Sequence, residues 1–144
     1  MAEDVINTAI KKFELENKAC ITTTLSIHGS KEDTDFNTLL YYYGSDQNAI
    51  ELLKEDKTLG ESIHPNFPYI KAEIIYAVQN EMCMTVEDAL ARRTRALLLD
   101  AKAAMESAPL VASLMAKAMN KSESWINDQV EAFNNVAKNY LPKT

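Results

Sequence analysis

Glycine and proline are scarce in this sequence, which has 3 Gly and 4 Pro among 144 residues. Gly29, Gly44 and Gly60 stand far apart, so the chain has neither a glycine-rich dinucleotide fingerprint nor a phosphate-binding loop. Cys20 and Cys83 belong to no C-x-x-C pair, which argues against a disulfide framework and a cysteine zinc site. The two histidines are not spaced as ligands on one helix. We therefore expect two reduced thiols and no catalytic, cofactor-binding or metal-binding residue.

The sequence has fewer basic than acidic residues. The 15 basic residues are outnumbered by 21 acidic ones, which gives a formal net charge of -6. Because binding to a phosphate backbone needs clustered Lys and Arg on a positive face, nucleic acid is not expected as a partner. No apolar run approaches the roughly 20 residues that span a bilayer, and acids stand near the N-terminus where a secretory signal would be basic. These features predict a soluble cytoplasmic protein.

The first half of the chain alternates between helical and irregular patterns. We expect a helix over about 2–16, followed by a connector that includes the β-branched stretch 21–27. A short helix should begin at Ser45 or Asp46. The segment 63–68 should be irregular, because each proline restricts the residue before it.

The second half has the helical period almost throughout. Apolar residues recur at four-residue spacing from Ile70 to Met82, which predicts a helix. Thr85 and Asp88 form a capping box from which a helix should run through Leu97 toward Met105. The last two helices should begin at Ser107-x-Pro109 and at Ser122, with Asn120 between them. The predicted fold class is all-α, a helical bundle with an N-terminal helix and an irregular linker.

The dense basic cluster Arg92, Arg93 and Arg95 lies on the helix expected after Thr85. At 100° per residue, Arg93 shares the apolar stripe of Leu90 and Leu97, whereas the other two arginines point elsewhere. The helical phase therefore predicts that Arg93 faces the core.

A buried guanidinium must be paired, since an unpaired buried charge typically costs about 3–5 kcal/mol. The nearest candidates are Glu81 and Asp100, so we predict a structural ion pair with Arg93. The alternative is that some arginines contact another domain or an anionic ligand, because a guanidinium suits carboxylate and phosphate.

Several motifs of the second half occur together: His64-Pro-x-x-Pro-Tyr69, Ala72-Glu-Ile-Ile-x-Ala-Val78, Thr85-Val-Glu-Asp and Ala91-Arg-Arg-Thr-Arg. In these motifs the chain resembles the C-terminal domain of FAD-dependent glycerol-3-phosphate dehydrogenases. The related alpha-glycerophosphate oxidases share this domain. The resemblance covers most of the chain and is most specific from Pro68 to Ala101.

The N-terminus fits the same resemblance. Met1-Ala-Glu-Asp4 resembles the start of the last helix of that family's flavin domain, and the segment ending at His28-Gly29 resembles the linker leading out of it. The resemblance thus implies two parts: residues 1–35 are the last helix of a missing flavin domain plus linker, and residues 36–144 are the C-terminal helical domain. Met1 would then be an internal residue of a longer parent protein.

By this resemblance, the parent would use FAD to oxidise sn-glycerol 3-phosphate to dihydroxyacetone phosphate, with membrane quinone or oxygen as electron acceptor. The flavin and substrate residues of the family lie in the missing domain, so the isolated chain is expected to be inactive and to bind no FAD. The implied partner is the N-terminal flavin domain of the same chain, and a homodimer stays open. The residues suggested for the domain interface are Arg92, Thr94, Arg95 and His28.

No calcium-binding extension follows the last helix, so the resemblance points to a bacterial-type enzyme at the cytoplasmic face of the membrane. A second hypothesis comes from another class of protein. The chain could be a free-standing acidic helical module that binds a partner through a helical groove. A glycine-rich dinucleotide-binding fold encoded directly upstream of Met1 would favour the dehydrogenase.

Overall fold

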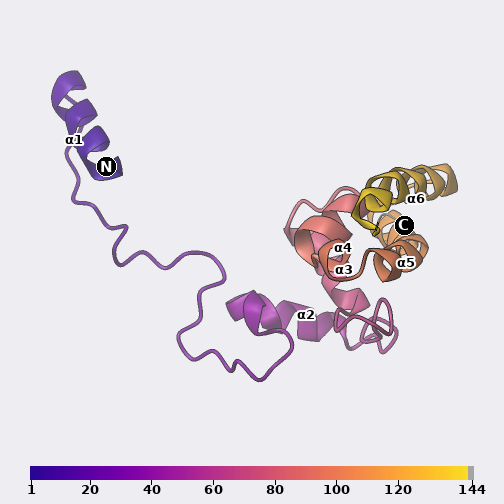
Figure 1. The fold of residues 1–144 in the computed structure, drawn as a ribbon. Helices are drawn as coiled ribbons and strands as arrows, with labels where there is room; N and C mark the ends of the chain where they lie inside the picture. Colours follow the sequence, from indigo (N-terminus) through magenta and orange to yellow (C-terminus); the bar gives the residue numbers. More distant parts are fainter. Residues whose placement is uncertain (143–144) are drawn as a thin grey trace.

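The structure is a computed structural model, and it describes residues 1–142. Within these residues the chain is helical, and its one extended pairing is an isolated antiparallel bridge between Ser62 and Ile70. The predicted all-α class is therefore confirmed (Figure 1). The helical elements in chain order are α1 (Ala2–Phe13), η1 (Tyr41–Asp46), α2 (Gln47–Leu53), α3 (Lys71–Asn80), η2 (Asp88–Arg93), α4 (Ala96–Leu99), α5 (Ala101–Met119), α6 (Glu123–Ala137) and η3 (Lys138–Tyr140).

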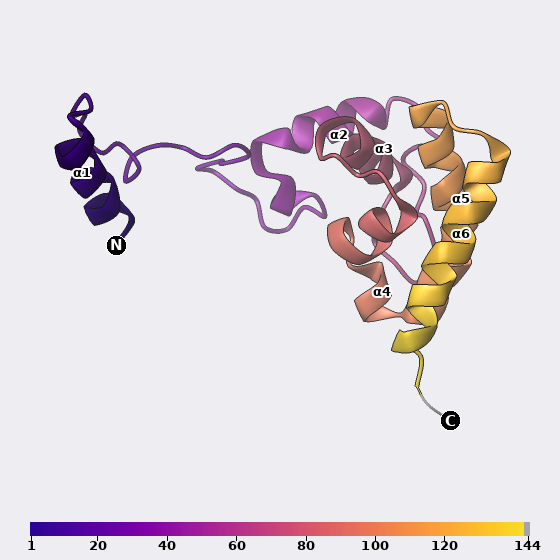
Figure 2. The same cartoon turned by 90° about the horizontal axis from the view of Figure 1, so that it is seen from above.

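Helix α1 and the linker after it stand apart from the bundle (Figures 1 and 2). None of the residues of α1 is buried, although its apolar side chains gather on one face. Glu14 ends the helix in the left-handed conformation, and residues 15–40 then run without regular helix or strand. An amphipathic helix is normally stabilised by burying its apolar face, and α1 buries none of it here.

Helix α3 lies between two separate hydrophobic cores. Ile74 and Ala77 belong to the main core, which η2, α4, α5 and α6 complete. Ala72 and Tyr76 belong to a smaller core with Leu40 and residues of α2. Because α3 is covered on both sides, apolar residues occur on two of its faces and not only in one narrow stripe.

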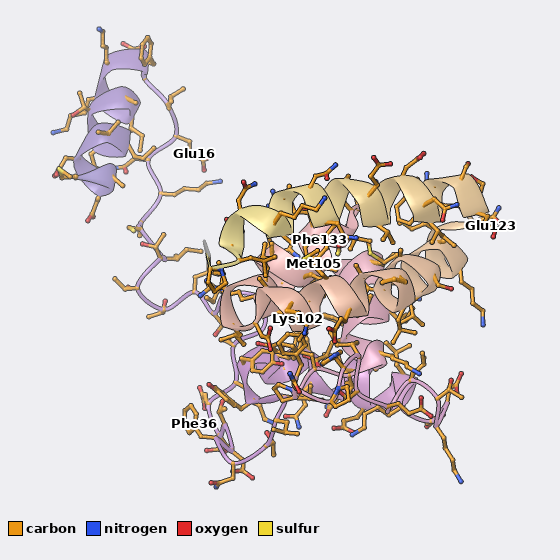
Figure 3. The ribbon with its side chains drawn as sticks, turned by 45° about the vertical axis from the view of Figure 1, so that its right-hand side comes forward. Glu16, Phe36, Lys102, Met105, Glu123 and Phe133 are labelled. Carbon is orange, nitrogen blue, oxygen red and sulfur yellow. The ribbon has the colours of Figure 1, made fainter. Side chains whose placement is uncertain are left out.

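The main core is closed by the pairing of α5 with α6. Six alanines of α5 are buried, and such small side chains allow neighbouring helices to approach closely. Phe133 of α6 is 1% exposed and packs in the same core as Met105 of α5, and both are labelled in Figure 3. Ser122 caps α6 by accepting from the amide of Trp125, and Asn120 ends α5 in the left-handed conformation, both as predicted.

The continuous helix predicted from Thr85 toward Met105 is wrong. The capping box itself forms, because the Asp88 amide donates to Thr85 Oγ1 and Asp88 Oδ2 accepts from the Thr85 amide, each at 3.0 Å. The chain then makes a π-helical turn, breaks at Arg95 with φ 57°, and makes one turn of α4. It turns again at Asp100, whose extended backbone and side chain begin α5.

The helix start predicted at Ser107 is wrong as well. Helix α5 continues through this point, where Ser107 is buried and its hydroxyl donates to the Ala103 carbonyl at 2.7 Å. Pro109 lies on the exposed side of α5. On that side water can satisfy the carbonyl group that proline leaves without an N–H partner.

Candidate functional site

Arg93 lies across the end of α3, where its side chain contacts Glu81. Its Nη2 donates to the Glu81 carbonyl oxygen at 2.6 Å, and its Nε lies 3.5 Å from the Glu81 carboxylate. The Arg93 side chain is 40% exposed, so the burial inferred from helical phase is wrong. The π-helical turn changes the angle per residue, which rotates Arg93 out of the stripe of Leu90 and Leu97.

Asp100 is not a partner of Arg93. Its Oδ1 accepts from the Ala103 amide at 3.0 Å, and its Oδ2 accepts from the Asn66 side chain at 3.2 Å. These hydrogen bonds hold the pKa of the Asp100 carboxyl below its usual range. Asp100 therefore caps α5 and ties it to the proline-containing loop, because the helix predicted to pass through this residue is broken there.

The remaining residues of the basic motif take separate positions. Arg92 pairs within its own turn, with Glu87 at 2.7 Å and Asp88 at 2.9 Å. Thr94 is 6% exposed, and its hydroxyl donates to the Ala89 carbonyl, so it is unavailable to a partner domain as the structure stands. Arg95 is exposed, and within residues 1–142 no carboxylate lies within 4 Å of it.

His28 lies in the linker, 86% exposed, far in sequence from the arginines. Its Nε2 is 2.8 Å from the Asp46 carboxylate, an ion pair when His28 is protonated. The Ser45 amide also donates to the Gly29 carbonyl, so the linker is fastened to η1 at this point. The structure therefore does not bring His28 and the arginines into one cluster.

A buried carboxylate that the sequence analysis missed lies in the middle of the molecule. Glu73 of α3 is 2% exposed. Its Oε1 accepts from the hydroxyls of Tyr42 at 2.5 Å and Tyr43 at 3.2 Å, and its Oε2 accepts from the Ile70 amide at 2.7 Å. One feature of the sequence could have revealed part of its role. Glu73 lies three residues after Ile70, which precedes α3, and this is the spacing at which a Glu side chain reaches back to cap a helix.

The electrostatics of this cluster follow from its burial. Desolvation raises the pKa of the Glu73 carboxyl, although the three hydrogen bonds oppose the shift. Desolvation and the neighbouring Glu73 carboxylate also raise the pKa values of Tyr42 and Tyr43. The cluster borders a cavity of about 330 Å³ that is also lined by Leu40, Glu51, Lys54 and Pro68. It fastens η1 to α3 and presents no nucleophile paired with a base.

Within 1–142, no group of three or more His, Cys, Asp or Glu side chains is placed to hold a metal ion. In that part of the chain no helix is both long and apolar enough to cross a bilayer.

Comparison with known proteins identifies the domain. The family described as the C-terminal domain of alpha-glycerophosphate oxidase matches residues 20–125. The chain belongs to this family. The matched range includes the capping box, the basic motif and the buried Glu73.

The curated relatives are glycerol-3-phosphate dehydrogenases named as mitochondrial. The enzyme of Mesocricetus auratus is 32% identical over 144 residues, a match that covers 85% of this chain and 20% of the relative. That of Macaca fascicularis is 30% identical over 162 residues, covering 98% of this chain and 22% of the relative. The chain thus spans about a fifth of the length of these proteins. No solved structure matches the chain.

These names correct one prediction from the sequence. Relatives from Mesocricetus auratus to Arabidopsis thaliana are named as mitochondrial, so the predicted cytoplasmic location is wrong. They also run against the expected bacterial-type enzyme. The cytoplasmic prediction relied on the lack of a basic N-terminal signal, and the bacterial type on the lack of a calcium-binding C-terminal extension. The ends of a chain that spans about a fifth of its relatives carry no such information.

Proposed function

We propose that the chain is the accessory C-terminal domain of a longer parent protein, an FAD-dependent glycerol-3-phosphate dehydrogenase. This parent oxidises sn-glycerol 3-phosphate to dihydroxyacetone phosphate. Membership of the C-terminal family and the names of the relatives support this proposal. In it, FAD and substrate are bound by a preceding domain, and electrons pass to quinone or oxygen. The parent acts in the mitochondrion, as the names of the relatives indicate.

The observation that carries the proposal is the uncovered face of α1. Val5, Ile6 and Phe13 are 67%, 59% and 66% exposed, although they share one face of an amphipathic helix. Contiguous apolar surface of this kind marks an interaction site. We assign the flavin domain of the same protein as the partner that covers it, with residues 1–35 as the last helix of that domain plus the linker and 36–144 as the accessory domain.

The exposed arginines are our candidates for a second contact with the flavin domain. Arg95 has no carboxylate partner within residues 1–142, and Leu98 and Leu99 of the adjoining α4 are 60% and 66% exposed. A guanidinium beside apolar side chains is a common composition at the centre of interfaces. Arg92 and His28 already lie next to carboxylates of this chain and would contribute less.

The proposal is tested by the coding sequence upstream of Met1 and by activity. A glycine-rich dinucleotide-binding fold encoded there is the expected finding, and an ordinary promoter would instead favour a free-standing adaptor. The longer protein should show flavin absorbance and reduce a quinone analogue with glycerol 3-phosphate, whereas the 144-residue chain should do neither. A yellow, active 144-residue chain would overturn the assignment.

A further inference from the structure

The segment formed by η1 and α2 crosses α3 on the side opposite the main core. Leu40, directly before η1, and Ile50 of α2 are buried together with Ala72 and Tyr76 of α3, and the four form a cluster separate from the main core. A unit with so few buried apolar contacts should open at a lower free energy than the rest of the fold. The hydroxyls of Tyr42 and Tyr43 tie η1 to Glu73 of α3.

We propose that η1 and α2 form a strap that opens from α3 as a unit while the bundle stays folded, and that Glu73 is the latch that holds the strap closed. The geometry supports both parts. Glu73 is 2% exposed under the strap, and Tyr42 and Tyr43 of η1 converge on one of its oxygens. Its other oxygen is fixed by the Ile70 amide, so the carboxyl group cannot swing away without losing a backbone hydrogen bond.

Opening of the strap would change how the domain is attached to the linker. The strap comes directly after the linker in the chain, so an open strap lengthens the tether between α1 and the bundle. At roughly 3.3 Å per extended residue, the 6 residues of η1 and 7 of α2 would span on the order of 40 Å when unwound, about twice their helical length.

The latch should respond to pH, and the sign follows from burial. Closure raises the pKa of the Glu73 carboxyl, so the closed strap holds a proton more strongly than the open one. Closure is then most favourable below the open-state value of about 4.3 and weakens as pH rises through the closed-state value. Each unit between the two values corresponds to about a tenfold change in the opening equilibrium.

Other charged and titratable groups surround Glu73, and their effects on opening of the strap have to be distinguished from that of Glu73. The Glu81 carboxylate raises the pKa of Glu73 further, and Tyr69 faces it from the loop before α3. Glu51 and Lys54 of α2 line the same cavity and pair with each other at 2.7 Å. The pair of His28 with Asp46 is a second tie that strengthens when His28 is protonated.

Amide hydrogen exchange on the 144-residue chain tests the proposal, with rates corrected for intrinsic exchange between pH 4.5 and 8. We expect peptides of η1 and α2 to be at least about 100-fold less protected than those of α5, and to lose protection as pH rises. The Glu73→Gln variant should abolish most of this pH dependence, because the amide cannot ionise. Strap protection equal to that of α5 would overturn the separate opening.

Two further variants distinguish the latch from its neighbours. His28→Asn removes the linker tie, and the pH dependence of the strap should survive it if Glu73 is the latch. Tyr42→Phe removes a hydrogen bond that lowers the Glu73 pKa, so it should make the pH dependence steeper. A pH dependence lost in His28→Asn but kept in Glu73→Gln would assign the switch to the histidine and refute the latch.

Discussion

The guanidinium of Arg93 donates to the backbone carbonyl of Glu81 at 2.6 Å, which joins η2 to the end of α3. Because the Arg93 side chain is 40% exposed, its loss should cost less than a fully buried ion pair. We expect Arg93→Ala to lower the free energy of unfolding by about 1–2 kcal/mol in urea titrations. Arg95→Ala is the control and should change it by less than about 0.5 kcal/mol. Equal losses would show that the Glu81 contact does not stabilise the fold.

Acid should weaken the capping box at the start of η2. Burial opposes the charge of Asp88, but hydrogen bonds from Thr85 and Met84 and the charge of Arg92 outweigh it and lower the pKa of the carboxyl. The ionised Asp88 carboxylate therefore stabilises the fold at pH values above the ordinary Asp pKa of about 3.9. This stabilisation is lost as the pH falls through the lower pKa of Asp88 in the native state. Asp88→Asn should cost about 1 kcal/mol at pH 7 and much less at pH 2.5.

The matched control for Asp88 is Asp128→Asn on the exposed side of α6. It should leave the free energy of unfolding nearly unchanged at both pH values. If the cost of Asp88→Asn were the same at pH 2.5 as at pH 7, the stabilisation would not depend on the ionised carboxylate.

Phe133 should carry a large share of the contact between α5 and α6. It is 1% exposed, so truncation to Ala leaves a cavity in the main core and should cost about 3–5 kcal/mol. Leu98→Ala removes an apolar side chain that is 60% exposed and should cost under about 0.5 kcal/mol. Differential scanning calorimetry of the two variants checks the contrast. Similar midpoints would mean that the helix pair is not packed as described.

Removal of residues 1–35 should leave the bundle intact. Helix α1 buries no residue, and the linker is fastened mainly by the His28–Asp46 pair and the Gly29–Ser45 hydrogen bond. We expect the thermal midpoint to shift by less than about 2 °C, with the truncated protein more soluble because an exposed apolar face is gone. A loss of cooperative unfolding would show that α1 packs on the bundle in solution.

The two thiols should differ in reactivity. Burial raises the pKa of the Cys83 thiol to about 12, whereas Cys20 is exposed in the linker. Since the thiolate is the nucleophile, an aromatic disulfide reagent at pH 8 should modify one thiol per chain in the native state and two in denaturant. The Cys20→Ser variant should show no fast reaction. Rapid modification of Cys83 in that variant would contradict the packing of the main core.

The sequence alone was sufficient for the features that depend on neighbours in the chain. The helical period predicts the all-α class, Ser122 and Asn120 mark real helix ends, and the Thr85–Asp88 box forms as expected. The motifs around His64 and Arg92 also identify the family. These predictions succeed because periodicity and capping are governed by residues three or four positions apart.

Only the tertiary structure decided the positions of residues that depend on distant partners. The left-handed turn at Arg95 and the extended backbone of Asp100 divide the helix that periodicity predicted as continuous, which makes Asp100 a cap, and the π-helical turn before them rotates Arg93 outward. The burial of Glu73 depends on Tyr42 and Tyr43, which lie about thirty residues away in the chain. Packing against such partners can outweigh a local preference worth a few tenths of a kcal/mol per residue, so the sequence near Glu73 did not reveal what covers it.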